Sequence, residues 1–171
     1  MMAKASPAWD LAFRIILADL MGGGAQGQAM APPQPSFNLS DIVQFPSPYQ
    51  KRWLEPNEEG LVWSYRLPAN HTAFITAIGI RRVRKGDYYF YKGSRLVDEP
   101  NSTFAYGSIE EPTLFDIGLN TSQEDIEFWG LNGDTQGANF EVLCRGFSIP
   151  TDKVDEFFAM LGRSGVRVGV G

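Results

Sequence analysis

The sequence predicts a mainly β protein, built around an antiparallel β-sandwich or jelly-roll-like domain. Short runs of aromatic and β-branched residues alternate with turn signals, such as the Pro-Ala-Asn segment 68–70 and the Asn-Gly-Asp segment 132–134. No long helical period separates these runs, as it would in a parallel α/β sheet. The expected strands span residues 61–67, 72–80, 87–92, 94–97, 113–119, 125–131 and 138–147.

Four parts are expected along the 171 residues of the chain. They are an N-terminal amphipathic helix (1–22), a long extended Gly/Pro-rich arm (23–60), the β-sandwich (61–150), and a short C-terminal helix with a strand-like tail (151–171). Alternation along the strands predicts which side chains form the core. That predicted core consists of Trp63, Phe74, Ile78, Leu114, Ile126, Phe128, Phe140, Val142 and Cys144.

The first helix opens with a Ser6 cap and Pro7 and ends at Gly22. Four large apolar residues recur at offsets of four, three and four, which places them on one stripe of the helix. They are Trp9, Phe13, Ile16 and Leu20. The charges of this helix cancel, so its attraction to an anionic membrane is weak, and we expect the stripe to bind a groove of another protein chain.

The arm is rich in Gly, Pro, Gln and Ser, a composition that cannot bury enough apolar surface to offset the entropy of ordering. We therefore expect it to lie along neighbouring copies in an assembly, held by spaced apolar anchors. The anchors are Phe37, Ile42, Phe45, Tyr49 and Trp53. The alternative is an arm that folds back over its own domain.

The C-terminal part begins with Thr151 or Asp152 as the cap of a helix that ends at Gly162. Its apolar stripe, Val154, Phe157, Phe158 and Leu161, is expected to cover an edge or end of the sandwich. In the tail, Val166 and Val168 alternate with small or charged residues, as in an edge strand. This tail is expected to pair as an extra strand with a sheet of the same subunit or of a neighbouring one.

Little in the sequence indicates catalysis. The single Cys144 lies in an alternating run and is interpreted as a buried apolar residue. The single His71 follows a turn and has no Cys or His at metal-ligand spacing. No nucleotide-binding or nucleophile motif is present. We therefore expect no enzyme activity, no catalytic residue, no metal and no cofactor.

Charge argues against a general nucleic-acid binder, because 15 basic residues face 20 acidic ones and the net charge is −5. One basic segment (81–85) precedes four aromatic residues (88–91), a combination that can grip single strands. Alternation places Tyr88 and Phe90 on one side, where they belong to the core. The segment is therefore interpreted as ordinary surface or a contact for an acidic partner.

Two segments, SYRLPANHTAFIT (64–76) and EFWGLNGDTQGANFEVLCRGF (127–147), resemble a class of small β-sandwich virion proteins of tailed bacteriophages. With the strands between them, they cover about half the chain. Proteins of this class serve as head decoration, neck or tail accessory subunits, and long terminal arms lock neighbours together. The class supplies no catalytic residues.

The resemblance implies a non-enzymatic structural subunit of a phage particle, made in the host cytoplasm and located in the virion. Its expected partners are copies of itself and other virion proteins, with neither nucleic acid nor membrane among them. The alternative is a carbohydrate- or receptor-binding module in which Trp63, Tyr106 and Trp129 are exposed for sugar stacking. Accessible rings grouped in one patch would favour that alternative.

Overall fold

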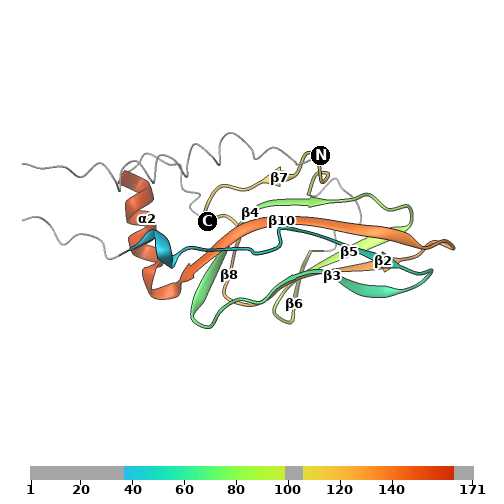
Figure 1. The fold of residues 1–171 in the computed structure, drawn as a ribbon, viewed down its shortest axis with the longest axis horizontal. Helices are drawn as coiled ribbons and strands as arrows, with labels where there is room; N and C mark the ends of the chain where they lie inside the picture. Colours follow the sequence, from blue (N-terminus) through green and yellow to red (C-terminus); the bar gives the residue numbers. More distant parts are fainter. Residues whose placement is uncertain (1–36, 99–105, 164–171) are drawn as a thin grey trace, which may run out of the picture.

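The computed structural model describes residues 37–98 and 106–163 (Figure 1). The expected helix 1–22, arm residues 23–36 and the strand-like tail lie outside these residues. The partner-binding expectations for Trp9, Phe13, Ile16, Leu20, Val166 and Val168 therefore remain predictions.

Two antiparallel sheets form the domain. Sheet A has six strands: β1 (Val43–Gln44), β2 (Tyr49–Leu54), β4 (His71–Ile80), β7 (Thr113–Leu114), β8 (Thr121–Ser122) and β10 (Ala138–Pro150). Sheet B has the order β3 (Glu59–Tyr65), β9 (Ile126–Asn132), β5 (Gly86–Lys92), β6 (Arg95–Asp98). In sheet A, β10 pairs with β4 on one side and with β1 and β2 in succession on the other. The prediction of a mainly β protein with antiparallel sheets is confirmed.

The main core lies between the two sheets, because inward-facing residues of both form one cluster. Phe140, Val142 and Cys144 of β10 are fully buried there, as the predicted alternation requires. Across from them, the rings of Phe90 and Phe128 from sheet B stack with centroids 4.6 Å apart. This shared cluster gives the domain a sandwich-like architecture.

Two members of the predicted core do not lie between the sheets: Phe74 is buried in a second cluster on the other face of sheet A, and Leu114 is exposed. Leu114 is 54% exposed, because β7 has only two residues at the edge of sheet A and pairs Leu114 with Ala77. A register shift in β4 puts Ala77 on the side of the sheet that faces away from sheet B. The expected alternation through residue 119 does not occur, since β7 ends at Leu114.

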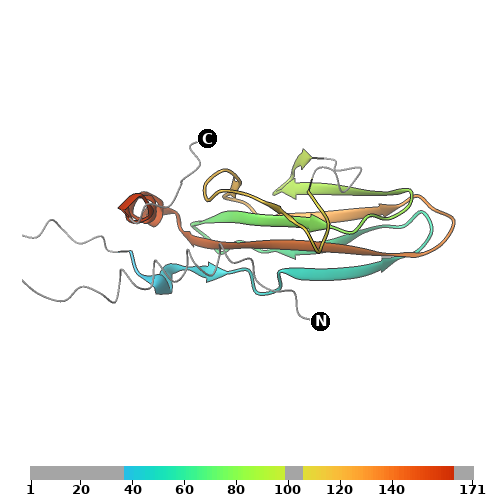
Figure 2. The same ribbon diagram turned by 90° about the horizontal axis from the view of Figure 1, so that it is seen from above.

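A second, smaller cluster covers the outer face of sheet A at one end. There Phe74 of β4 and Phe147 of β10 stack with ring centroids 5.3 Å apart. Phe157 and Leu161 of α2 (Val154–Arg163) are buried against these two rings. The ring centroids of Phe37 and Phe157 lie 5.3 Å apart. The C-terminal helix is thus confirmed, preceded by the 3-10 turn η2 (Thr151–Lys153). Figure 2 shows α2 almost end-on, so the helix runs across the direction of the strands.

Residues 37–60 are not an extended arm. They form the 3-10 turn η1 (Leu39–Asp41), β1, β2 and the start of β3. Phe37 and Phe45 are buried in the chain's own clusters, so their expected role as anchors on a neighbour is corrected. The rings of Phe45 and Tyr65 pack with centroids 4.2 Å apart. The Phe45 ring also lies against Gly146, where an added Cβ would be 2.6 Å from it. The alternative of a segment folded over its own domain describes this part of the chain.

Candidate functional site

Aromatic side chains remain accessible on two surfaces of the described residues. The first is a hollow on the outer face of sheet B, lined by Glu59, Tyr91, Ser94, Glu127 and Trp129, which we call the aromatic depression. The second is the outward side of β2, with Tyr49, Lys51 and Trp53, which we call the β2 face. Strand alternation contributes to both surfaces, since Glu127 and Trp129 occupy every second position of β9, as the side chains of the β2 face do in β2.

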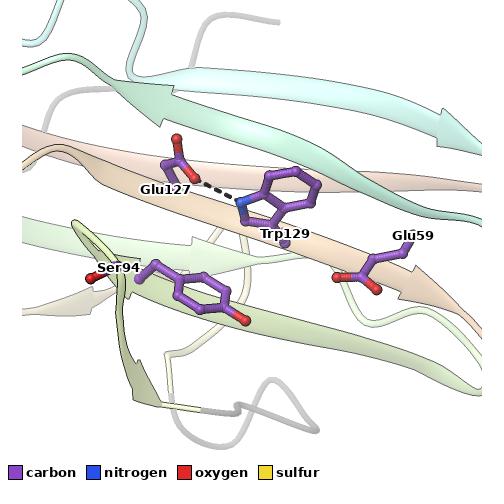
Figure 3. Close-up of a pocket in the computed structure, with 5 residues that line it drawn as sticks. Glu59, Ser94, Glu127 and Trp129 are labelled. Atoms are coloured by element: carbon purple, nitrogen blue, oxygen red, sulfur yellow. Dashed lines mark hydrogen bonds between the residues drawn. The ribbon is translucent and has the colours of Figure 1, made fainter.

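The aromatic depression results from the alternation of β9. Ile126, Phe128 and Gly130 are buried, whereas Glu127 and Trp129 between them are half-buried on the outer face. Antiparallel register places Tyr91 of β5 opposite Glu127. Glu59 comes from the start of β3, and Ser94 comes from the turn after β5. Together they line a shallow hollow of about 300 Å³ (Figure 3).

The indole of Trp129 is held in place by its own strand. Its Nε1 donates a hydrogen bond of 2.8 Å to Oε2 of Glu127, two residues earlier. Figure 3 shows the indole lying between the carboxylates of Glu127 and Glu59. The lining contains two carboxylates, two aromatic rings and two hydroxyls, but no basic side chain. This surface therefore presents π faces and hydrogen-bond acceptors in a negatively charged setting.

The β2 face carries the two most exposed aromatic residues of the described chain. Tyr49 is 43% exposed and Trp53 is 52% exposed. The Tyr49 hydroxyl donates a 2.8 Å hydrogen bond to Oε2 of Glu141, and Trp53 Nε1 donates one of 2.9 Å to Glu55. Both rings are thus fixed. Among the described strands, β2 pairs only with β10, so the β2 face borders an open sheet edge.

Glu141 joins three elements on this side of sheet A. It accepts hydrogen bonds from Tyr49 and from the guanidinium of Arg81, which follows β4. The bond to Glu141 raises the pKa of Arg81. Partial burial and then the bond to Glu141 raise the pKa of Tyr49. The network fixes the β2 face against β10 and the end of β4.

The basic segment 81–85 does not combine with all four following aromatic residues. Tyr88 and Phe90 are buried in the core, as predicted, while Tyr89 and Tyr91 lie on the outer face of sheet B. The Tyr88 hydroxyl donates to the Arg81 carbonyl at 2.7 Å. Arg84 forms a salt bridge with Asp134, with 3.8 Å between Nε of Arg84 and Oδ2 of Asp134. Two of the four rings are therefore unavailable for base stacking.

The sequence-predicted residues divide between core and surface. Among the expected arm anchors, only Tyr49 and Trp53 are exposed, and Ile42 is partly buried against the second cluster. Of the three rings considered for sugar stacking, Trp63 and Tyr106 are buried and Trp129 is accessible. Trp63 instead donates its Nε1–H to the Ser47 carbonyl at 2.8 Å.

The two residues considered for nucleophilic or metal chemistry have ordinary structural surroundings. Cys144 is fully buried, and burial raises the pKa of its thiol. Nδ1 of His71 lies 3.3 Å from the Ser148 hydroxyl. Within residues 37–98 and 106–163, no group of three or more His, Cys, Asp or Glu side chains could hold a metal ion.

The function of this chain has to be inferred from its fold and from the two surfaces. No protein-family model matches the chain, and no curated protein matches it. In the described part of the chain, no helix is both long enough and apolar enough to cross a membrane.

Sequence reasoning missed Glu59, Tyr91, Ser94 and Glu127 as members of one site. The segment IEFWGLN contains a usable signal, since a carboxylate and an indole two positions apart in a strand point to the same side. The contributions of β3 and β5 follow from pairing register, which no local pattern gives.

Proposed function

We propose that this chain is a non-enzymatic structural subunit of a virus particle, of the kind found in tailed phages. The jelly-roll-like sandwich is the body, and the segment before residue 37 together with the β2 face joins it to neighbouring copies and to other virion proteins. The observation that carries the proposal is the β2 face. Two fixed, exposed aromatic rings border an open sheet edge, a combination typical of protein interfaces.

The organisation of the chain supports an assembly role for the part before residue 37. Its amphipathic stripe and its Gly, Pro and Gln content suit a connector rather than a core. The resemblance of residues 64–76 and 127–147 to virion sandwich proteins points the same way. The site of the subunit in the particle, whether head, neck or tail, follows from the symmetry of its assembly.

The first test is the mass of the full chain in solution, measured by size-exclusion chromatography with light scattering. We expect discrete oligomers, and Tyr49→Ser combined with Trp53→Ser should lower their mass. A matched control is Leu119→Ser, because Leu119 is 53% exposed but lies away from β2. A full chain that stays monomeric at all concentrations would contradict the proposal.

A second test removes the connector. Truncation must begin at Phe37 rather than later, because Phe37 and Phe45 belong to the packed clusters. The shortened chain should keep its β circular dichroism and lose the higher oligomers. Membership of a particle is tested by mass spectrometry of purified particles from the natural source, and absence of the chain from all of them would argue against a virion role.

A carbohydrate- or receptor-binding module is the second candidate, carried by the accessible indole of Trp129 in the aromatic depression. Aromatic platforms of this kind can stack on sugar rings. Burial of Trp63 and Tyr106 reduces the platform expected from the sequence to one indole with a neighbouring tyrosine. A glycan array without a hit would remove this candidate.

A further inference from the structure

The aromatic depression has a chemical character of its own, separate from the β2 face. Glu59 and Glu127 bring two carboxylates to its rim, and Trp129 and Tyr91 bring two π faces. The neighbouring basic residue of β5, Lys92, is directed elsewhere, since its Nζ donates to Asn120 Oδ1 at 2.8 Å and to the Thr121 carbonyl at 2.7 Å. The hollow thus lacks an internal counter-ion among its lining residues.

We propose that the aromatic depression binds an arginine side chain of a partner protein. A cation placed over an indole or phenol face is attracted by the ring quadrupole, and nearby carboxylates add to that attraction. Oε2 of Glu127 already accepts from Trp129, which leaves Oε1 and the Glu59 carboxylate as acceptors for a ligand. The site therefore offers charge, stacking and hydrogen-bond acceptance to a single group.

Arginine fits this combination better than lysine does. Its guanidinium is planar, so it can stack flat on a ring while its N–H groups reach a carboxylate in the same plane. The ammonium of lysine is a strongly hydrated point charge without a stacking face. The hydrogen bond between Trp129 and Glu127 places a ring and a carboxylate side by side before any ligand arrives, which lowers the ordering cost of binding.

The negative charge also distinguishes a cation from a neutral sugar. A sugar ring can stack on Trp129 and donate hydroxyl hydrogen bonds to the carboxylates, but a neutral ligand leaves both negative charges uncompensated as their hydration is reduced. A guanidinium neutralises that charge. The inference concerns ligand chemistry and does not depend on the virion role.

The experiment uses the full chain and ligand-observed saturation-transfer NMR, which suits weak binding and large assemblies. The probes are N-acetyl-arginine amide and N-acetyl-citrulline amide, which have nearly the same shape but differ in charge. We expect the arginine compound to bind about fivefold or more tightly than the citrulline compound. Its affinity should fall as salt is raised, because the rim carboxylates are accessible to screening.

Three variants locate the binding. Trp129→Ala removes the ring, and Glu127→Gln removes a charge while keeping a carbonyl oxygen that can accept from the indole. Each should weaken arginine binding by about threefold or more. Glu111→Gln, an exposed glutamate in the loop before β7, is the matched control and should leave the affinity unchanged.

Other outcomes overturn the inference. These are equal binding of the arginine and citrulline compounds, equal losses in Glu127→Gln and Glu111→Gln, or no saturation transfer from the arginine compound at about 10 mM. If a methyl glycoside binds with an affinity that Trp129→Ala abolishes and Glu127→Gln spares, the depression is a sugar site. The chain could still be a structural subunit in each case, because oligomer mass and the β2 face are measured separately.

Discussion

β4 and β9 lie inside their respective sheets, yet only one of them is buried on both faces. In β4, every residue from Thr72 to Ile80 is buried. In β9, buried and half-buried residues alternate along the whole strand. The sequences differ in the same way, since TAFITAIGI is almost continuously apolar and IEFWGLN alternates. A continuous apolar run therefore marks a covered sheet face, and alternation marks an accessible one.

The cover over β4 comes from elements at both of its ends. At one end, Phe157 and Leu161 of α2 pack with Phe37 over Phe74. Toward the other end, the Ser108 carbonyl comes so near Gly79 that a Cβ there would lie 2.4 Å from it. Sheet B has no such cover over Trp129 among the described elements, and its outer face forms the aromatic depression.

The largest expected effect is on the covered face. Phe74→Ala should lower the free energy of unfolding by about 3 to 5 kcal/mol, because it removes a fully buried ring and leaves a cavity among three phenylalanines. Urea unfolding followed by tryptophan fluorescence measures the change. A loss below about 1 kcal/mol would mean that the cover over β4 is not part of the stable fold.

The cover itself is tested at α2. Phe157→Ala should cost about 3 kcal/mol, since the Phe157 ring contacts Phe37, Phe74 and Phe147 and is fully buried. Phe158→Ala is the matched control on the same helix, and because Phe158 is only partly buried it should cost about 1 kcal/mol. Equal losses at the two positions would show that the helix packs in a different rotation.

Much of this architecture could be predicted from the sequence, because β3, β4, β5, β6, β9 and β10 carry their own runs of aromatic and aliphatic residues. β8, with only Thr121 and Ser122, carries no such run and was not predicted. β1 and β2 could not be predicted, since Pro46 and Pro48 interrupt the segment and β2 buries only Leu54. Its strand state depends on pairing with β10, about 90 residues later in the chain. Leu114 was misplaced for a related reason, since local alternation does not reveal where an edge strand ends.

The aromatic depression shows the same division. The exposure of Trp129 could be predicted, because it follows from alternation in one strand. Tyr91 and Glu59 come to it through pairing of β9 with β5 and β3, so they depend on register between distant segments.

Alkaline pH should weaken the shared core rather than either outer face. Burial raises the pKa of Tyr88 above its ordinary value of 10. The folded protein therefore keeps this proton when the unfolded chain has lost it. The contribution to stability is complete below about pH 10 and is lost as pH rises further, by up to about 1.4 kcal/mol per pH unit.

The measurement for Tyr88 is the free energy of unfolding at several pH values between 8 and about 11. Tyr88→Phe should flatten the decline above pH 10, although it also removes the hydrogen bond to the Arg81 carbonyl and lowers stability at every pH. Tyr49→Phe is the control on the exposed β2 face, where solvent screens the hydroxyl. Its free energy of unfolding should decline with pH about as steeply as that of the wild type. The same decline in Tyr88→Phe as in wild type would assign the alkaline loss to other groups.

The smallest effect is expected for the largest side chain of the accessible face. Trp129→Ala should change the free energy of unfolding by less than about 1 kcal/mol, because the indole is half-buried and rests on the surface of sheet B. Trp53→Ala, at 52% exposure on the β2 face, should behave alike. Urea titrations of both variants beside Phe74→Ala compare aromatic deletions on covered and accessible faces. A loss of 3 kcal/mol or more at Trp129, approaching that at Phe74, would show that the outer face of sheet B is covered in solution.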